Sequence, residues 1–175
     1  MQIKTIQPAD YDAVDKLVKD AFTQTDHGYD GEVELIHALR EDPAYQAYLE
    51  VVAFDRQQQP VGLGVLSPIT ISDGTKTTTG LALAPLAVAP AHQKEGIGRR
   101  LMQKLEQRAR ISGATYVSIL GWPDYYSKFG YRPASQFDIQ AGFDVPDDAY
   151  MIKSLAPNGL DGVHGTVHYS KAFGL

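Results

Sequence analysis

The sequence contains no cysteine among its 175 residues. This absence excludes disulfide bonds, metal sites built on thiolates and an acyl intermediate carried by a cysteine. Any group transfer by this protein must therefore be direct or use another nucleophile.

Long apolar segments are also missing. No uninterrupted apolar run approaches the roughly 18 residues that a membrane span requires. The start of the chain, MQIKTIQPADYD, turns acidic where a secretory signal would place an apolar stretch. We therefore expect a cytoplasmic protein with no membrane partner.

Positive charge is in the minority, with 16 Lys and Arg against 21 Asp and Glu, for a net charge of −5. Broad attraction to nucleic acid is therefore disfavoured, and we expect no nucleic-acid partner. Hydrophobic residues make up 43% of the chain, which is enough to build a packed core. The length predicts a single domain over residues 1–175.

Hydrophobic periodicity predicts a mixture of helices and strands. Helices are expected where apolar residues recur at three- and four-residue spacing, over residues 8–22, 33–39, 96–111 and 123–129. Strands are expected where short apolar runs end in turn residues, over residues 3–6, 49–54, 61–66, 80–89, 116–120, 150–154 and 166–169. The order indicates a mixed α/β fold in which a buried strand leads into a long helix. The segment 141–175 is rich in Gly, Pro and Asp, and the pattern is weaker there.

The most informative segment joins that buried strand to that helix, LAVAPAHQKEGIGRRL over residues 86–101. Gly96 and Gly98 stand at the start of the helix, where unpaired backbone N–H groups and the positive dipole end bind phosphate oxygens. Glycine matters because a Cβ would keep a pyrophosphate away from the backbone.

Three cations, Lys94, Arg99 and Arg100, gather at this junction of an otherwise acidic protein. Cations in the first turn of a helix oppose its dipole, and a docked anion would reverse the sign of that effect. Taken alone, Arg99 or Arg100 is equally well explained as a solvated surface side chain.

Several classes of protein use glycine-rich turns. A dinucleotide fingerprint needs a third glycine where Leu101 stands, and no Gly-Lys-Ser/Thr ending of a P-loop is present. The six residues QKEGIG from Gln93 to Gly98 fit the remaining pattern, Gln/Arg-x-x-Gly-x-Gly/Ala. They resemble the pyrophosphate-binding signature of the GNAT superfamily of N-acetyltransferases.

The strand before the turn strengthens the resemblance. In the family, this strand binds the pantetheine arm of coenzyme A through its backbone. Pro85 cannot donate to a sheet ladder, so it marks a bulge, an edge or a parting of strands. A buried strand with an awkward proline is the alternative. The resemblance implies a coenzyme-binding set of Leu86, Ala87, Val88, Gln93, Lys94, Glu95, Gly96, Ile97, Gly98 and Arg99.

A second element lies downstream, DYYSKFGY over residues 124–131. It resembles the family's Leu-Tyr-Glu-Lys-x-Gly-Phe element and places Tyr126 at the tyrosine that commonly protonates the departing thiolate of coenzyme A. A phenol with a reference pKa near 10 is protonated at neutral pH and suits that role. Packing in the core is the alternative for Tyr126, and Tyr125 would replace it if the register were shifted by one residue. Tyr131 and Ser127 depart from the family's usual Phe and acidic residue, which alters the pocket rather than the chemistry.

The resemblance covers most of the chain, with core motifs over residues 80–131. It is strongest to small bacterial N-acetyltransferases that share Ala21-Phe22 and a Tyr-Tyr-x-x-Phe-Gly segment. It implies a GNAT-like acyl-CoA N-acyltransferase fold, with a central mixed, mostly antiparallel twisted sheet flanked by helices. It also implies acetyl-CoA as cosubstrate, direct acetyl transfer to a primary amine of a small molecule or peptide, and a homodimer as one oligomeric option.

Two other functions compete with this one. A non-catalytic acyl-CoA sensor or regulatory module would carry the same glycine turn, although Tyr126 favours the enzyme. A nucleotide-binding oxidoreductase is poorly supported because Leu101 breaks its fingerprint.

The general base and the acceptor site are less clearly marked. Candidate bases are Glu32, Glu34, His37, His92 and Asp124, and for each of them a structural role is the stronger interpretation. Glu32 suits a helix N-terminus, while Glu34 and His37 suit a solvated face. Asp26, Asp30, Glu32 and Glu34 concentrate negative charge around residues 23–31, which we expect to border a site for a cationic amine. His164 and His168 have the spacing of metal ligands on a helix, but the flanking glycines favour a surface strand, and we predict no metal.

Overall fold

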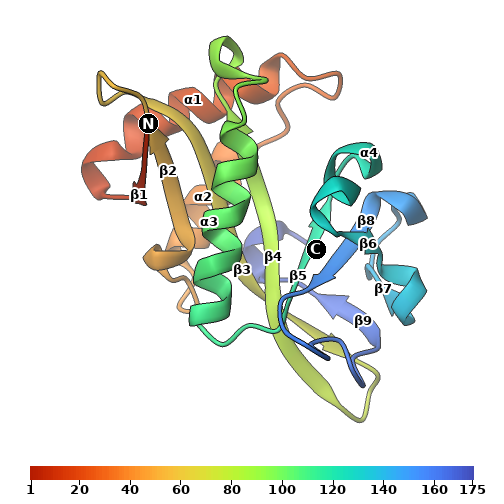
Figure 1. The fold of residues 1–175 in the computed structure, drawn as a ribbon. Helices are drawn as coiled ribbons and strands as arrows, with labels where there is room; N and C mark the ends of the chain where they lie inside the picture. The colour runs from red at the N-terminus through yellow and green to blue at the C-terminus, as the bar shows by residue number, and fades with distance from the viewer. The chain divides into compact units, whose positions relative to one another are not determined.

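Strands and helices follow one another along the chain largely in the predicted order (Figure 1). The computed structural model describes residues 1–175. The helices are α1 Tyr11–Thr23, α2 Glu32–Glu41, α3 Ile97–Ile111 and α4 Pro123–Tyr126. The strands are β1 Gln2–Thr5, β2 Glu50–Phe54, β3 Pro60–Ser72, β4 Thr77–Val88, β5 Tyr116–Leu120, β6 Arg132–Pro133, β7 Ile139–Gln140, β8 Tyr150–Ser154 and β9 Gly165–His168.

The chain divides into two compact units. The first unit comprises Met1–Leu66 and Pro85–Arg108, and the second comprises Ser67–Ala84 and Ala109–Leu175. Strands β3 and β4 and helix α3 each contribute residues to both units. The single domain expected from the sequence stays a prediction.

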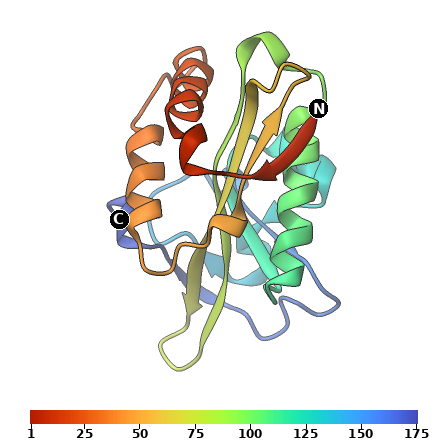
Figure 2. The same ribbon diagram turned by 90° about the vertical axis from the view of Figure 1, so that its left-hand side faces the viewer.

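In the first unit, an antiparallel sheet separates two layers of helix. Strand β1 pairs with β2 from Gln2↔Phe54 to Thr5↔Val51, and β2 pairs in turn with β3. Every residue of β2 is buried, four of them apolar and the fifth the charged Glu50. Helices α1 and α2 cover one face of this sheet and α3 covers the other (Figure 2). Helix α1 buries the apolar stripe Val14, Leu17, Val18 and Ala21, which the sequence pattern predicted.

Helix α3 lies directly on β3 because two glycines leave room for it. A Cβ added at Gly62 would lie 2.9 Å from side-chain carbons of Ile97 and Leu101. A Cβ added at Gly64 would lie 2.6 Å from Leu105 Cδ1. Ile97, Leu101 and Leu105 are all buried, so the apolar spacing that predicts a helix over residues 96–111 forms its buried face. The contact fixes where the helix begins, and with it the glycine-rich junction.

A buried polar network ties α2 to β2. Glu50 has no exposed side-chain surface and accepts hydrogen bonds from Arg40 Nη2 at 2.6 Å and from the Tyr45 hydroxyl at 2.6 Å. The Arg40 guanidinium lies 3.8 Å from the centre of the Tyr11 ring. Burial, together with the bond to Glu50, raises the pKa of Tyr45, so this hydroxyl remains a donor. Loss of either partner of a buried charge pair leaves the other charge unpaired at a high cost, and the pair therefore holds α2 against β2.

The second unit carries the rest of the sheet. Strand β4 pairs with β5 in parallel from Leu81↔Val117 to Leu83↔Ile119. Strand β5 pairs antiparallel with β8, which pairs antiparallel with β6. Strand β9 pairs antiparallel with β3 and parallel with β7. The predicted fold class, a mixed and mostly antiparallel sheet flanked by helices, is confirmed.

The structure extends two predicted strands, β3 at its end and β4 back to Thr77 at its start, and adds two short ones. Strand β3 continues past residue 66, through Pro68, and its last residues pair with β9 from Thr70↔His168 to Ser72↔Thr166. The proline obscured this extension because proline usually ends a strand. Strands β6 and β7 have two residues each and carry no periodicity that a sequence can show. None of the helices combines the length with the apolar character that crossing a bilayer demands.

Candidate active site

Residues 93–98, which we call the glycine turn, connect the end of β4 to α3 by way of a single 3-10 turn at Pro90–His92. Lys94 has a φ of 67° and Gly96 a φ of 78°, so two residues of the turn are left-handed. The Gly96 carbonyl accepts a hydrogen bond from the Arg100 amide at 3.2 Å, which makes Gly96 the residue from which the helix is hydrogen-bonded. The amides of Ile97 and Gly98 therefore belong to the first helical turn and have no acceptor within the helix.

The turn is tied back to the strand that precedes it. Gln93 Nε2 donates to the Val88 carbonyl at 3.4 Å, and the Ala89 amide donates to the Val61 carbonyl at 2.9 Å. The Gln93 side chain thus links the glycine turn to the end of β4. Its predicted contact with pyrophosphate stays a prediction.

The turn is exposed, and it carries Lys94 and is followed directly by Arg99. Lys94, Glu95, Gly96 and Arg99 are exposed to solvent. Glu95 is paired with His92, whose Nδ1 lies 3.3 Å from Glu95 Oε2. Positive charge beside unpaired amides at a helix start is the electrostatic environment that an anion requires.

The strand segment predicted for pantetheine leads straight into the turn. Ala87 is buried, while Leu86 and Val88 are half-buried. The parallel register of β4 with β5 ends at Leu83, two residues before Pro85. The proline thus follows the end of the ladder, as its missing N–H group predicts.

Tyr126 is the last residue of α4 and belongs to the second unit. Its amide donates to the Trp122 carbonyl at 3.1 Å, and its own carbonyl accepts from the Tyr131 amide at 3.4 Å. Its ring lies edge-on to Tyr125, with 4.9 Å between ring centres. A Cβ at Gly121 would overlap the Tyr126 ring, so this glycine creates the space that the ring occupies. Burial raises the pKa of Tyr126 above its usual value, which keeps the hydroxyl protonated at neutral pH.

The ten residues predicted to bind the coenzyme therefore lie together in the first unit, on the end of one strand, the turn that follows and the start of a helix. Tyr126 stands in the second unit.

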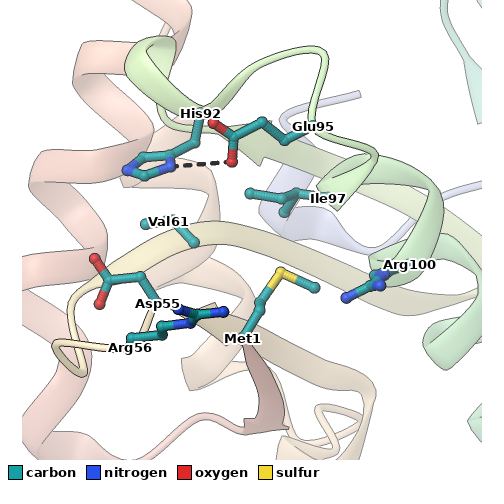
Figure 3. A pocket seen from close by; sticks show the side chains of 8 residues that line it. All are labelled: Met1, Asp55, Arg56, Val61, His92, Glu95, Ile97 and Arg100. Atoms are coloured by element: carbon teal, nitrogen blue, oxygen red, sulfur yellow. Dashed lines mark hydrogen bonds and ion pairs between the residues drawn. The ribbon is translucent and has the colours of Figure 1, made fainter.

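A pocket that the sequence did not reveal lies beside the glycine turn (Figure 3). It has a volume of about 270 Å³ and is bounded by the turn after β2, by the start of the chain and by the glycine turn with α3. Its lining residues are Met1, Asp55, Arg56, Val61, His92, Glu95, Ile97 and Arg100. The sequence indicates only a turn over residues 55–60, and Arg56 is the one feature of that turn that could have pointed to the pocket.

Only some of the acidic side chains around the loop before α2 form hydrogen bonds within the protein. Glu32 accepts the Asp30 amide at 2.9 Å, and Glu34 accepts the Tyr29 hydroxyl. This hydrogen bond from Tyr29 lowers the pKa of Glu34, which makes Glu34 a weaker base. Asp26 and Asp30 expose their side chains to solvent.

The remaining base candidates lie apart from one another along the chain. His37 Nε2 lies 2.7 Å from Asp15 Oδ2, and Asp124 is exposed in the first turn of α4. His168 is the last residue of β9, which confirms the strand interpretation for this histidine, whereas His164 lies just before the strand. His164 Nε2 lies 3.5 Å from Asp73 Oδ2, and no three potential metal ligands gather anywhere in the chain.

Comparisons with known proteins agree with this geometry. The model of the acetyltransferase (GNAT) family matches residues 11–131. The uncharacterized N-acetyltransferase YhbS of Escherichia coli K12 is 31% identical over 173 residues, which cover 99% of this chain and 98% of that protein.

Solved structures give the same result. The crystal structure of YhbS from Escherichia coli in complex with CoA has a TM-score of 0.88 and 29% identity, and the match covers 99% of this chain and 92% of that one. A GNAT family acetyltransferase from Brucella melitensis in complex with acetyl-CoA has a TM-score of 0.79 and 27% identity, with coverage of 98% and 97%.

These matches define the fold of an N-acetyltransferase. The chain belongs to the GNAT family of acetyltransferases. The predicted family and the predicted enzyme class, an N-acetyltransferase, are therefore confirmed.

The left-handed backbone at Gly96 predicts a difference between two substitutions. Nothing lies within 4 Å of an added Cβ, so only the backbone conformation opposes a side chain there. Gly96→Ala should cost about 1–2 kcal/mol, which corresponds to a melting temperature lower by about 2–8 °C. Gly96→Asn should cost less, because asparagine tolerates this conformation. Thermal unfolding without ligand checks this, and equal melting temperatures for the two variants would contradict it.

Proposed function

We propose that this protein transfers an acetyl group from acetyl-CoA directly to a primary amine of a small molecule or peptide. The glycine turn and Arg99 hold the pyrophosphate, and the backbone of Leu86, Ala87 and Val88 holds the pantetheine arm. Tyr126 is the acid that protonates the departing sulfur.

The single observation that carries the proposal is the glycine turn itself. Two left-handed residues direct the backbone into the first turn of α3, whose amides lack helical acceptors. The relatives from Escherichia coli and Brucella melitensis were solved with CoA and acetyl-CoA, and they match nearly the whole of this chain. Their ligands support the same cosubstrate here.

The chemistry needs one acid and one base. The amine nitrogen attacks the thioester carbonyl carbon, the carbon–sulfur bond breaks, and the sulfur takes a proton as coenzyme A leaves. We assign that proton to the Tyr126 hydroxyl. Since the raised pKa of Tyr126 exceeds the roughly 8.5 of a thiol, complete transfer is uphill. Much of the stabilisation of the departing thiolate then comes from a hydrogen bond that the Tyr126 hydroxyl donates to the sulfur.

The acceptor is proposed to be cationic. Asp26 and Asp30 are exposed, while Glu32 and Glu34 accept hydrogen bonds from the loop itself. The two aspartates therefore supply negative charge that an approaching ammonium would meet, and the proton that this ammonium must lose passes to water or to a base.

Ligand-dependent stabilisation tests cosubstrate binding. Acetyl-CoA or coenzyme A at a hundred times its Kd should add about 2.7 kcal/mol to the free energy of unfolding. For a chain of this size the melting temperature should rise by roughly 5–10 °C. NAD, measured in parallel, should give no rise. Stabilisation by NAD alone would contradict the assignment of the glycine turn, and stabilisation without turnover on any amine would favour an acyl-CoA sensor.

Substitution of the proposed acid tests the chemical step. Tyr126→Phe should lower kcat by about a hundredfold or more and leave the affinity for coenzyme A nearly unchanged. Since the pKa of Tyr126 is raised, its deprotonation moves to higher pH, and kcat should show no loss from this group between pH 7 and 10. Tyr125→Phe is the matched control. Equal turnover by the Tyr126 variant would remove Tyr126 from this role.

Neutralising the acidic loop tests the acceptor. Asp26→Asn and Asp30→Asn should each raise KM for a cationic amine by up to about fivefold, with kcat and the KM for acetyl-CoA unchanged, because exposed charges interact weakly. Asp12→Asn removes the same charge from an exposed position of α1 and serves as control. An unchanged amine KM in the double variant would end the idea.

A further inference from the structure

The pocket beside the glycine turn is lined by acidic, basic and apolar side chains (Figure 3). Arg56 enters from the turn after β2 and Arg100 from α3. Their guanidinium groups point toward the middle of the pocket from opposite sides, with the Met1 side chain between them. Two guanidinium groups directed at one space can bind the same anion from two sides.

The two acidic residues of the pocket are already engaged. Asp55 Oδ1 accepts the amides of Gln57 at 2.8 Å and Gln59 at 2.9 Å, which holds the turn after β2 in shape. Glu95 is paired with His92 at 3.3 Å. Neither carboxylate is paired with an arginine of the pocket. The N–H donors of Arg56 and Arg100 therefore remain available to a ligand.

The chemistry of these groups selects an oxyanion. A guanidinium offers a planar fork of N–H donors that matches the oxygens of a phosphate, and two forks from different elements suit a doubly charged phosphate monoester. The rigid turn around Asp55 lowers the entropy lost when Arg56 binds, since the backbone beneath it is already fixed.

The apolar base of the pocket favours a particular chemical group next to the phosphate. Val61 and Ile97 are each only 4% exposed, and they line the pocket together with the Met1 thioether. Apolar carbons and a polarizable sulfur favour a flat ring over a fully solvated chain. A volume of about 270 Å³ accommodates a ring together with its phosphate.

We propose that Arg56 and Arg100 bind the phosphate monoester of a nucleotide in this pocket. The phosphate has two sources: the ribose phosphate at the nucleotide end of coenzyme A, or a separate nucleotide that binds beside the coenzyme. The first source rests on the proposed function, because it requires the coenzyme on the adjoining glycine turn.

Calorimetric titration of the full chain tests the proposal. The ligands are coenzyme A, dephospho-coenzyme A, which lacks only the ribose phosphate monoester, and adenosine 3′-monophosphate. The proteins are the wild type, Arg56→Gln, Arg100→Gln and the double variant. Lys16→Gln is the control, since Lys16 is an exposed cation on α1 outside the pocket. Melting temperatures without ligand establish that the variants are folded.

If the coenzyme supplies the phosphate, the wild type should bind coenzyme A about tenfold more tightly than dephospho-coenzyme A. The double variant should bind the two equally, at the wild-type affinity for dephospho-coenzyme A. If a separate nucleotide supplies it, the wild type should bind both coenzymes equally. It should also bind adenosine 3′-monophosphate when saturated with coenzyme A, and the double variant should lose that binding.

Wild-type affinities for all three ligands in the double variant would overturn the proposal while leaving the proposed function intact. A wild type that neither distinguishes the two coenzymes nor binds adenosine 3′-monophosphate would also overturn it. Failure of the wild type to bind either coenzyme would instead contradict the proposed function.

Discussion

The site depends on one steric constraint, the direct contact of α3 with β3. Gly62 and Gly64 present no side chain to the helix, and the helix fills that space with its buried stripe. Each large apolar side chain of the stripe contributes about 1.5–3 kcal/mol when it is fully buried. This packing fixes the helix axis, and the bond from the Ala89 amide to Val61 fixes the end of β4. The glycine turn must join two ends that are already fixed.

That constraint explains the unusual backbone of the turn. Lys94 is left-handed although lysine, unlike asparagine or aspartate, gains nothing from that conformation. Backbone strain of this kind persists where the surrounding structure enforces it, and it concentrates at functional sites. The strained lysine adds its charge to an exposed turn in a protein of net charge −5. Strain and charge at one place agree with a site built for an anion.

The sequence was informative where periodicity is long or chemistry is specific. The stripes of α1 and α3 each extend over several turns, so they identified these helices and their buried faces. The residues of the glycine turn were recognisable because glycine spacing, charge and the preceding strand coincide. The pocket with Arg56 was missed because it forms only when a turn after β2 meets the start of α3, two segments about forty residues apart. No local pattern records a contact of that kind, and the same holds for the pairing of β3 with β9.

The buried network of Arg40, Glu50 and Tyr45 bears on how this enzyme can change over evolutionary time. The network fixes α2 to the sheet, while the stripe of α1 fixes the other end of the loop that joins these helices. With its two ends fixed, the loop can accept substitutions or insertions at a small cost in folding free energy, since closure entropy grows slowly with loop length. Under the proposed role of this loop in acceptor binding, acceptor preference can diverge through the loop without loss of the scaffold.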